Sequence, residues 1–217
     1  MNRRDAVCGF ITAVLLSAAP IAVGQTIAGE PDRVRWQRLT DLLAAMAVHE
    51  GDSVADVGAG DGFVTVRLSP VVGPAGKVYA EDIADAPLQR LRKRVEDAGL
   101  VNVTIVKGEA DDPHLPHEML DAVIILNAYH EMTAHESVLA HVRDALKAGG
   151  RLVVAEPGPL KAGQTRTEQI RDHRISGELV AADVSQAAFD VVDRQDDFAP
   201  LPGGVSGTYS LIVARKR

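Results

Sequence analysis

A glycine-rich segment is the part of this sequence that most clearly suggests binding chemistry. It reads Asp56-Val57-Gly58-Ala59-Gly60-Asp61-Gly62 and lies at the end of a short apolar run. Glycine at alternate positions lets a chain turn tightly and brings backbone N–H groups close to a ligand. A dinucleotide fingerprint of the form G-x-G-x-x-G/A needs a small residue at position 63, where this chain has Phe63. The pattern therefore favours a nucleotide-like ligand over a dinucleotide; the alternative is a glycine turn that binds nothing.

Acidic and polar residues follow the next three apolar runs. Glu81 and Asp82 come about 24 residues after Gly58, where a carboxylate can accept hydrogen bonds from both hydroxyls of a ribose. An acidic segment, Gly108–Pro116, follows the third run, and Asn127 follows the fourth. Ligands of open α/β sheets bind beyond the carboxyl ends of the strands. We therefore expect these segments to face a common cleft.

The spacing D-x-G-x-G-x-G resembles motif I of the class I S-adenosylmethionine (SAM) methyltransferases. The resemblance covers about residues 49–217, including the passage Lys147–Glu156. Within that family the chain looks like the small-molecule enzymes, distantly the ubiquinone/menaquinone type, including leader-bearing uncharacterised members. The resemblance implies a SAM cofactor, S-adenosylhomocysteine as product, a small-molecule acceptor and no metal.

The same resemblance implies a set of cofactor contacts. The glycine loop would pack against the amino-acid part of SAM, and Asp82, or else Glu81, would accept the ribose hydroxyls. Either Glu109 or Asp111 would accept a hydrogen bond from the adenine amino group, with the backbone of that loop along the ring. The cofactor-binding residues implied in this way are Asp56, Gly58, Ala59, Gly60, Gly62, Glu81, Asp82, Glu109, Ala110, Asp111 and Asn127.

Two histidines are candidates for acceptor chemistry. SAM already carries an electrophilic methyl group, so the protein mainly has to align a nucleophile with it. A base assists when the acceptor is a phenol, thiol or protonated amine, and histidine suits that role near neutral pH. We hypothesise that His130 or His173 removes the acceptor's proton while Tyr129 lines the pocket. The alternative is that both histidines only form local hydrogen bonds.

Other motifs are weaker. The segment His130–His135 resembles a zincin motif, but its histidines are five residues apart and so point about 140° away from each other on a helix. They cannot share a zinc ion in the way of H-E-x-x-H, and we predict no metal site. Asn127-Ala128-Tyr129 lacks the two prolines of the motif found in amino-group nucleic-acid methyltransferases.

Alternating apolar runs define the elements that position these residues. Strands are expected at 53–57, 77–80, 103–106, 122–126, 151–155, 189–194 and 209–214. Helices are expected in 31–48, near Phe63–Leu68 with an end at Pro70, and at 87–98, 135–148 and 176–187. This alternation predicts an α/β, doubly wound, mostly parallel sheet in one domain. The family resemblance implies the strand order 3-2-1-4-5-7-6 with the last strand antiparallel.

Length and composition exclude several classes of protein. The 217 residues suit one domain, and 46% hydrophobic with 24% charged residues is ordinary for a globular protein. The net charge of −7 disfavours nucleic acid as a partner. The single cysteine, Cys8, excludes an intramolecular disulfide and a cysteine-based zinc site.

The first 24 residues have the pattern of a signal peptide. Arg3 and Arg4 precede an apolar run from Ala6 to Val23, and small residues lie before Gln25. Pro20 interrupts the run, so a stable membrane span is not expected. We predict export to the periplasm or outside the cell; the alternatives are a cytoplasmic protein with a misassigned start and a membrane-anchored protein. The expected organisation is a leader (1–24), a helical extension (25–48) and the SAM domain (49–217).

Three functions are compatible with these features. The leading one is a SAM-dependent methyltransferase acting on a small molecule. A SAM-binding protein without catalytic turnover would keep the same motif I. A nicotinamide-dependent reductase is disfavoured by Phe63 and by the glycine spacing.

Overall fold

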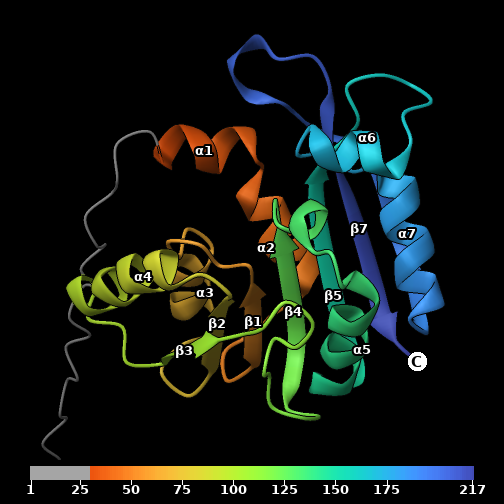
Figure 1. Cartoon of the computed structure of the whole chain (residues 1–217). Helices are drawn as coiled ribbons and strands as arrows, with labels where there is room; N and C mark the ends of the chain where they lie inside the picture. Colours follow the sequence, from red (N-terminus) through yellow and green to blue (C-terminus); the bar gives the residue numbers. More distant parts are fainter. Residues whose placement is uncertain (1–29) are drawn as a thin grey trace, which may run out of the picture.

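The computed structural model of the protein describes residues 30–217. A seven-stranded sheet runs through its centre (Figure 1). The strand order is β3-β2-β1-β4-β5-β7-β6, and β7 is antiparallel to both of its neighbours. The predicted topology is therefore confirmed. The strands are β1 (Ser53–Val57), β2 (Lys77–Asp82), β3 (Val103–Lys107), β4 (Leu120–Leu126), β5 (Leu146–Pro157), β6 (Phe189–Pro200) and β7 (Thr208–Lys216). The segment 1–24, where we predict a leader, lies outside the described residues.

Helices cover both faces of this sheet. They are α1 (Glu30–Trp36), α2 (Leu39–Met46), α3 (Thr65–Val72), α4 (Asp85–Asp97), α5 (His135–Ala145), α6 (Arg166–Arg171) and α7 (Gly177–Gln186), with short 3₁₀ turns η1 (Tyr129–Glu131) and η2 (Pro202–Gly204). The alternate strand residues of one face pack against α2, α3 and α4, and those of the other face pack against α5 and α7. Strands covered on both faces account for the almost wholly apolar runs in the sequence.

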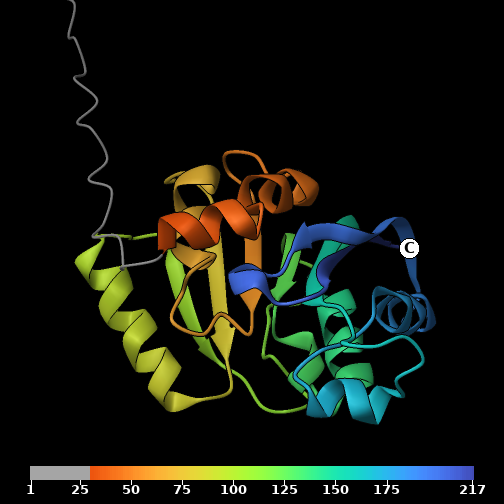
Figure 2. The ribbon, with the colours of Figure 1, turned by 90° about the horizontal axis from the view of Figure 1, so that it is seen from above.

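Helix α1 lies beyond the carboxyl ends of the parallel strands, on the side of β1 and β2 (Figures 1 and 2). Its buried Glu30 carboxylate accepts hydrogen bonds from Arg67 of α3 and Arg94 of α4, at 3.0 and 2.8 Å. Burial raises the pKa of Glu30, but the two guanidinium groups outweigh it and the net pKa is lowered. The helix is thus attached to the two helices that follow β1 and β2.

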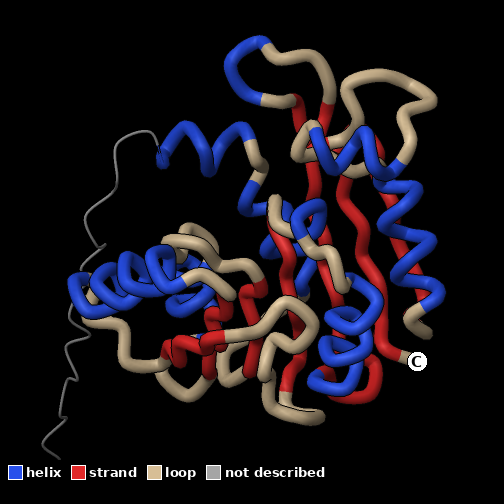
Figure 3. Tube along the Cα trace, in the orientation of Figure 1, coloured by secondary structure: helices blue, strands red, loops and turns tan. Residues whose placement is uncertain are grey.

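The structure corrects several element boundaries (Figure 3). Helix α5 ends at Ala145 rather than Ala148, because Leu146 already pairs with Leu120 and β5 runs through the following glycines. Helix α3 continues past Pro70 to Val72; the proline ring fits helical φ and removes one N–H donor near the end of the helix. Helix α6 lies between the expected strand at 151–155 and the expected helix at 176–187, in a segment where no element was predicted. No helix within residues 30–217 is long and apolar enough to cross a membrane.

Candidate functional site

A cavity of about 280 Å³ opens beyond the carboxyl ends of β1, β2 and β4. This is the position at which open α/β sheets bind ligands. Most of the residues that the sequence analysis assigns to a cofactor line it. The lining comprises Val57, Gly58, Gly60, Glu81, Asp82, Ile83, Glu109, Ala110, Pro113, Asn127, Ala128, Glu131, Met132, Thr133 and Val138.

The glycine loop forms one wall because of its backbone conformation. Gly58 and Gly60 have φ values of 71° and 58°, in the left-handed region that favours glycine. A Cβ built on Gly58 would lie 2.5 Å from the Cβ of Ala128, so the loop packs directly against the segment after β4. A Cβ on Gly60 would meet no atom within 4 Å, which leaves this part of the backbone open to a ligand.

Two carboxylates at the end of β2 hold this loop in place. The N–H of Gly58 donates to Glu81 Oε2 at 3.3 Å, and the N–H of Gly60 donates to Asp82 Oδ2 at 3.0 Å. Asp82 is partly exposed, whereas Glu81 is only 3% exposed. Both side chains line the cavity. Either carboxylate is therefore placed to be the one that, by the family resemblance, accepts the ribose hydroxyls.

The carboxyl group of Glu81 is a weaker acid than an ordinary glutamate. Burial raises its pKa from about 4.5 to about 7, and the negative charges of Asp82 and Asp56 add to the rise. The folded protein therefore binds this proton more tightly than the unfolded chain does. The resulting contribution to stability is complete below about pH 4.5 and is lost as the pH rises through about 7.

Glu81→Gln should remove this part of the pH dependence of stability, since its side-chain oxygen can still accept from Gly58 while no charge forms. Relative to wild type, we expect the variant to gain free energy of unfolding between pH 5 and pH 8. Urea unfolding across that range measures the difference, with Glu96→Gln as an exposed control. Parallel stability profiles for Glu81→Gln and wild type would contradict the assignment.

Some predicted cofactor residues do not reach the cavity. Asp56 is buried and accepts a 2.6 Å hydrogen bond from the Thr65 hydroxyl, and burial raises the pKa of its carboxyl to about 6. Ala59 packs into the apolar cluster against α4. Gly62 also lies at α4, since a Cβ there would meet Leu91. These residues shape the loop from behind rather than line the cavity.

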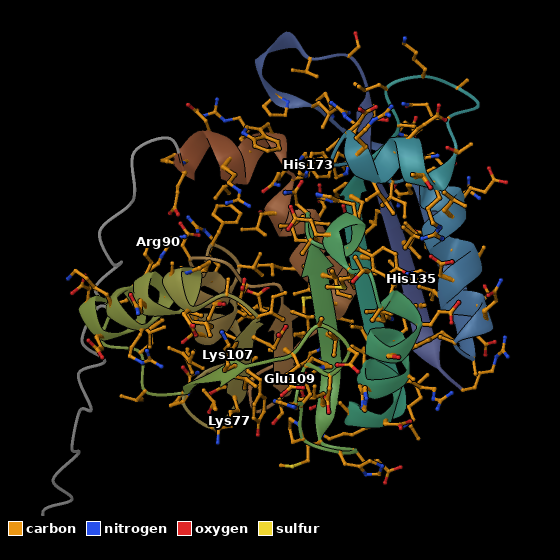
Figure 4. The ribbon with its side chains drawn as sticks, viewed as in Figure 1. Lys77, Arg90, Lys107, Glu109, His135 and His173 are labelled. Carbon is orange, nitrogen blue, oxygen red and sulfur yellow. The ribbon has the colours of Figure 1, made fainter. Side chains whose placement is uncertain are left out.

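The loop after β3 supplies the far wall. Glu109 and Ala110 line the cavity, and Asp111 does not; Figure 4 shows Glu109 on this loop. Between the two acidic residues left open by the sequence, the geometry favours Glu109. Ile83 lines the same region, and its apolar side chain is 55% exposed. Its position directly after Glu81 and Asp82 was the signal that could have identified it.

Asn127 closes the cavity at the end of β4. Its φ of 56° is in the left-handed region, which asparagine tolerates better than most residues. Its side-chain Oδ1 accepts a 3.0 Å hydrogen bond from the Tyr209 hydroxyl, which in turn accepts from Gln37 at 3.4 Å. The side chain of Asn127 is therefore held from β7 and from the segment between α1 and α2.

A fully buried carboxylate organises the turn that follows Asn127. Glu156, at the end of β5, accepts 2.7 Å hydrogen bonds from the N–H groups of Ala128 and Tyr129. Its second oxygen lies 2.6 Å from Nδ1 of His130. Burial lowers the pKa of His130, but the hydrogen bond and charge of Glu156 outweigh this effect, and the net pKa is raised. In the sequence, Glu156 is only the last residue of the passage Lys147–Glu156, and no local pattern indicates this role.

The structure brings His173 to His130. Their rings lie edge to face with centroids 5.9 Å apart, and Glu131 lies between them, with its Oε1 3.7 Å from His130 Nε2 and 3.6 Å from His173 Nδ1. His135 lies apart from His173, as Figure 4 shows, and its Nε2 is 3.7 Å from Asp183 Oδ2. We call His130, Glu131 and His173 the histidine cluster. It adjoins the cavity through Glu131.

The proposed role of Tyr129 in lining the pocket needs correction. Tyr129 is 1% exposed and its hydroxyl donates to Asp183 of α7 at 2.9 Å. Burial and the Asp183 charge raise the pKa of the phenol far above its usual value. Arg166 of α6 also binds Asp183, at 2.6 Å. Tyr129 thus joins the turn after β4 to α6 and α7, because its hydroxyl binds the Asp183–Arg166 ion pair and does not line the cavity.

The methyltransferase-domain family matches residues 54–150 of the chain. The ubiquinone/menaquinone biosynthesis C-methyltransferase UbiE of Ectopseudomonas mendocina is 34% identical over 153 residues, which cover 68% of this chain and 59% of that protein. The chain thus spans about three fifths of the length of this curated relative.

Solved structures share the fold. A SAM-dependent methyltransferase from Aquifex aeolicus superposes with a TM-score of 0.72 at 23% identity, over 86% of this chain and 94% of that one. The geranyl diphosphate C-methyltransferase of Streptomyces coelicolor, solved with Mg²⁺, geranyl diphosphate and S-adenosylhomocysteine, gives 0.70 at 16% identity, over 86% and 80%. At 23% and 16% identity, these similarities show that the chain shares the Rossmann-like fold of these proteins.

Proposed function

We propose that this chain is a SAM-dependent methyltransferase that transfers a methyl group to a small-molecule acceptor. The observation that carries the proposal is the cavity between the glycine loop and the segment after β4, with Asp82 and Glu109 on its walls. The sequence and structural similarities to methyltransferases, including the C-methyltransferase relative, support the same class.

The residues present fit the chemistry of SAM. The open backbone at Gly60 leaves room for the amino-acid part, and the Asp82 carboxylate can accept hydrogen bonds from two ribose hydroxyls. Apolar Ile83 and Pro113 can cover the adenine ring, and Glu109 can accept from its amino group. When bound, SAM supplies an electrophilic methyl group; the chain must hold it and present the acceptor.

We propose that the acceptor lies against the histidine cluster, which adjoins the cavity at Glu131. A hydroxyl, thiol or amine acceptor loses a proton when it is methylated, and a cluster of two imidazoles and a carboxylate can assist that loss. Glu156 fixes the orientation of the His130 ring, while His173 comes from the segment between α6 and α7. The acceptor would therefore be enclosed by η1 and that segment.

Asp82→Asn should weaken binding of S-adenosylhomocysteine by about 10- to 100-fold, since hydrogen bonds to a charged partner contribute about 1.5–3 kcal/mol. Isothermal titration calorimetry measures this affinity. Asp85→Asn is the matched control, because Asp85 is 82% exposed and pairs with Lys107. Equal affinities for wild type and Asp82→Asn would contradict the assignment of Asp82 to the ribose.

Calorimetry with SAM, S-adenosylhomocysteine and NAD(H) tests the class of ligand. Phe63 is buried beneath the guanidinium groups of Arg33 and Arg67, at 3.8 and 4.3 Å from its ring centroid. A large ring thus occupies the position at which a dinucleotide fingerprint has a small residue. Binding of NAD(H) without S-adenosylhomocysteine would overturn the proposal. Release of S-adenosylhomocysteine during incubation with SAM and candidate acceptors would distinguish an enzyme from a protein that only binds SAM.

We also propose that residues 1–24 direct export of the chain. The support is the basic start followed by an interrupted apolar run. SAM is made in the cytosol, so an exported enzyme would need folded export with SAM bound or another supply. Cell fractionation with N-terminal sequencing tests this: an intact Met1 on soluble cytosolic protein would contradict it.

A further inference from the structure

The histidine cluster has the dimensions of a metal site. One ligating atom from each of His130, Glu131 and His173 lies within 4.8 Å of the others. Ligands of a tetrahedral zinc ion, at about 2.0–2.1 Å from the metal, lie about 3.4 Å from each other. The two distances to Glu131 Oε1, 3.7 and 3.6 Å, are close to that value. Glu131 and His173 have exposed side chains, so small rotations can close the remaining gap.

His130, the buried member of the cluster, has a carboxylate behind its ring, as metal-binding histidines commonly have. His130 Nδ1 faces Glu156 at 2.6 Å, so Nδ1 carries the proton and donates it to the carboxylate. The lone pair of the neutral ring is then on Nε2, the nitrogen that faces Glu131. A carboxylate behind a metal-ligating imidazole fixes its tautomer and raises its basicity. Glu156 is fully buried and fixed by two backbone N–H groups, so it cannot turn away.

We propose that His130 Nε2, Glu131 and His173 Nδ1 bind one divalent transition-metal ion, of which Zn²⁺ is the probe of choice. Two imidazoles and one carboxylate form a set that suits first-row divalent metals and leaves coordination positions open. The site is built from this chain's own residues, and it differs from the zincin arrangement because His173, not His135, is the second histidine.

The position of the site indicates which acceptors it serves. This step rests on the proposed function. Glu131 belongs both to the cluster and to the cavity wall, so an open coordination position lies beside the cofactor cavity. A cation there would hold an acceptor through an oxygen and lower the pKa of its hydroxyl or phenol group, whose proton passes to water. The acceptor class is thus a small molecule with a hydroxyl, phenol or adjacent oxygen donors.

Zinc titration of the full chain, freed of metal by chelation, tests the site by calorimetry. We expect one Zn²⁺ per chain to be lost or bound at least about 30-fold more weakly in His173→Ala, because a three-residue site has lost one ligand. His173 is 76% exposed, so this variant should fold. His49→Ala is the control: it also removes an exposed histidine, whose side chain is 82% exposed, and should keep wild-type affinity.

A second variant tests the supporting carboxylate. Glu156→Gln keeps an oxygen for the backbone N–H groups but can present an amide donor to His130 Nδ1, which moves the ring proton to Nε2 and blocks the ligand. We expect about 10- to 100-fold weaker zinc binding, as for other supporting residues of metal sites. Co²⁺ absorption in the visible range provides an independent readout of ligation.

The outcomes of these experiments distinguish failure of the metal site from failure of the proposed methyltransferase function. Equal zinc affinities for wild type, His173→Ala and His49→Ala would overturn the metal site. If the same metal-free protein still binds S-adenosylhomocysteine, the metal site alone is wrong and the cofactor site of the proposed function stands. A protein that binds zinc through His173 but does not bind S-adenosylhomocysteine would support the site and contradict the proposed function.

Discussion

Gly58→Ala is expected to weaken binding of S-adenosylhomocysteine by at least about 100-fold, equivalent to about 2.7 kcal/mol. The added methyl group would lie 2.5 Å from the Cβ of Ala128, and the φ of 71° is strained for alanine. Ala128 cannot move away easily, because its N–H donates a hydrogen bond to the buried Glu156 carboxylate. The loop must therefore shift into the cavity or away from Glu81. Calorimetry measures the loss of affinity.

Two further variants separate the clash from general strain. Gly99→Ala places alanine at a similar φ of 62° with no atom within 4 Å and away from the cavity, so it should keep wild-type affinity. The double variant Gly58→Ala/Ala128→Gly removes the opposing methyl group and should recover part of the binding. If Gly58→Ala binds as tightly as wild type while folding normally, the loop is not the cofactor wall.

Glu156→Ala is expected to lower the free energy of unfolding by about 3–5 kcal/mol, as for the loss of one partner of a buried charged pair. The change leaves two buried N–H groups, of Ala128 and Tyr129, and the ring of His130 without their acceptor. Urea or thermal unfolding measures the effect.

A matched surface change defines the baseline for this prediction. Glu96 is exposed on α4, and Glu96→Ala should alter stability by less than about 0.5 kcal/mol. A Glu156→Ala variant as stable as Glu96→Ala would show that the turn after β4 does not depend on the buried carboxylate. Glu156→Gln should lie between the two, because its oxygen still accepts from the backbone.

The cofactor side of the site was predictable because its signals are local. Gly58 and Gly60 lie at the end of β1, and Asp82 ends β2, so the order of parallel strands alone brings them together. The same local signals do not separate Asp82 and Glu109, which line the cavity, from Asp56 and Asp111, which do not. Whether a side chain points into the cavity or behind it depends on loop conformation, which neither residue type nor spacing records.

The acceptor side depended on contacts between distant parts of the chain. His130 and His173 are 43 residues apart, and helix α6, which carries the chain toward His173, had no apolar pattern to reveal it. Tyr129 could equally have faced a pocket or the core until the position of Asp183 was known.

By itself, the sequence determined the strand–helix alternation, the sheet order implied by its family resemblance and the glycine and acidic residues at the first two strand ends. Only the tertiary structure decided that Glu156 is fully buried, that it orients His130, and that Glu131 and His173 complete the cluster. The physical reason is that hydrophobic periodicity fixes which residues are buried within an element. The partners of a buried polar group, in contrast, are fixed only when separate elements pack and every donor must find an acceptor.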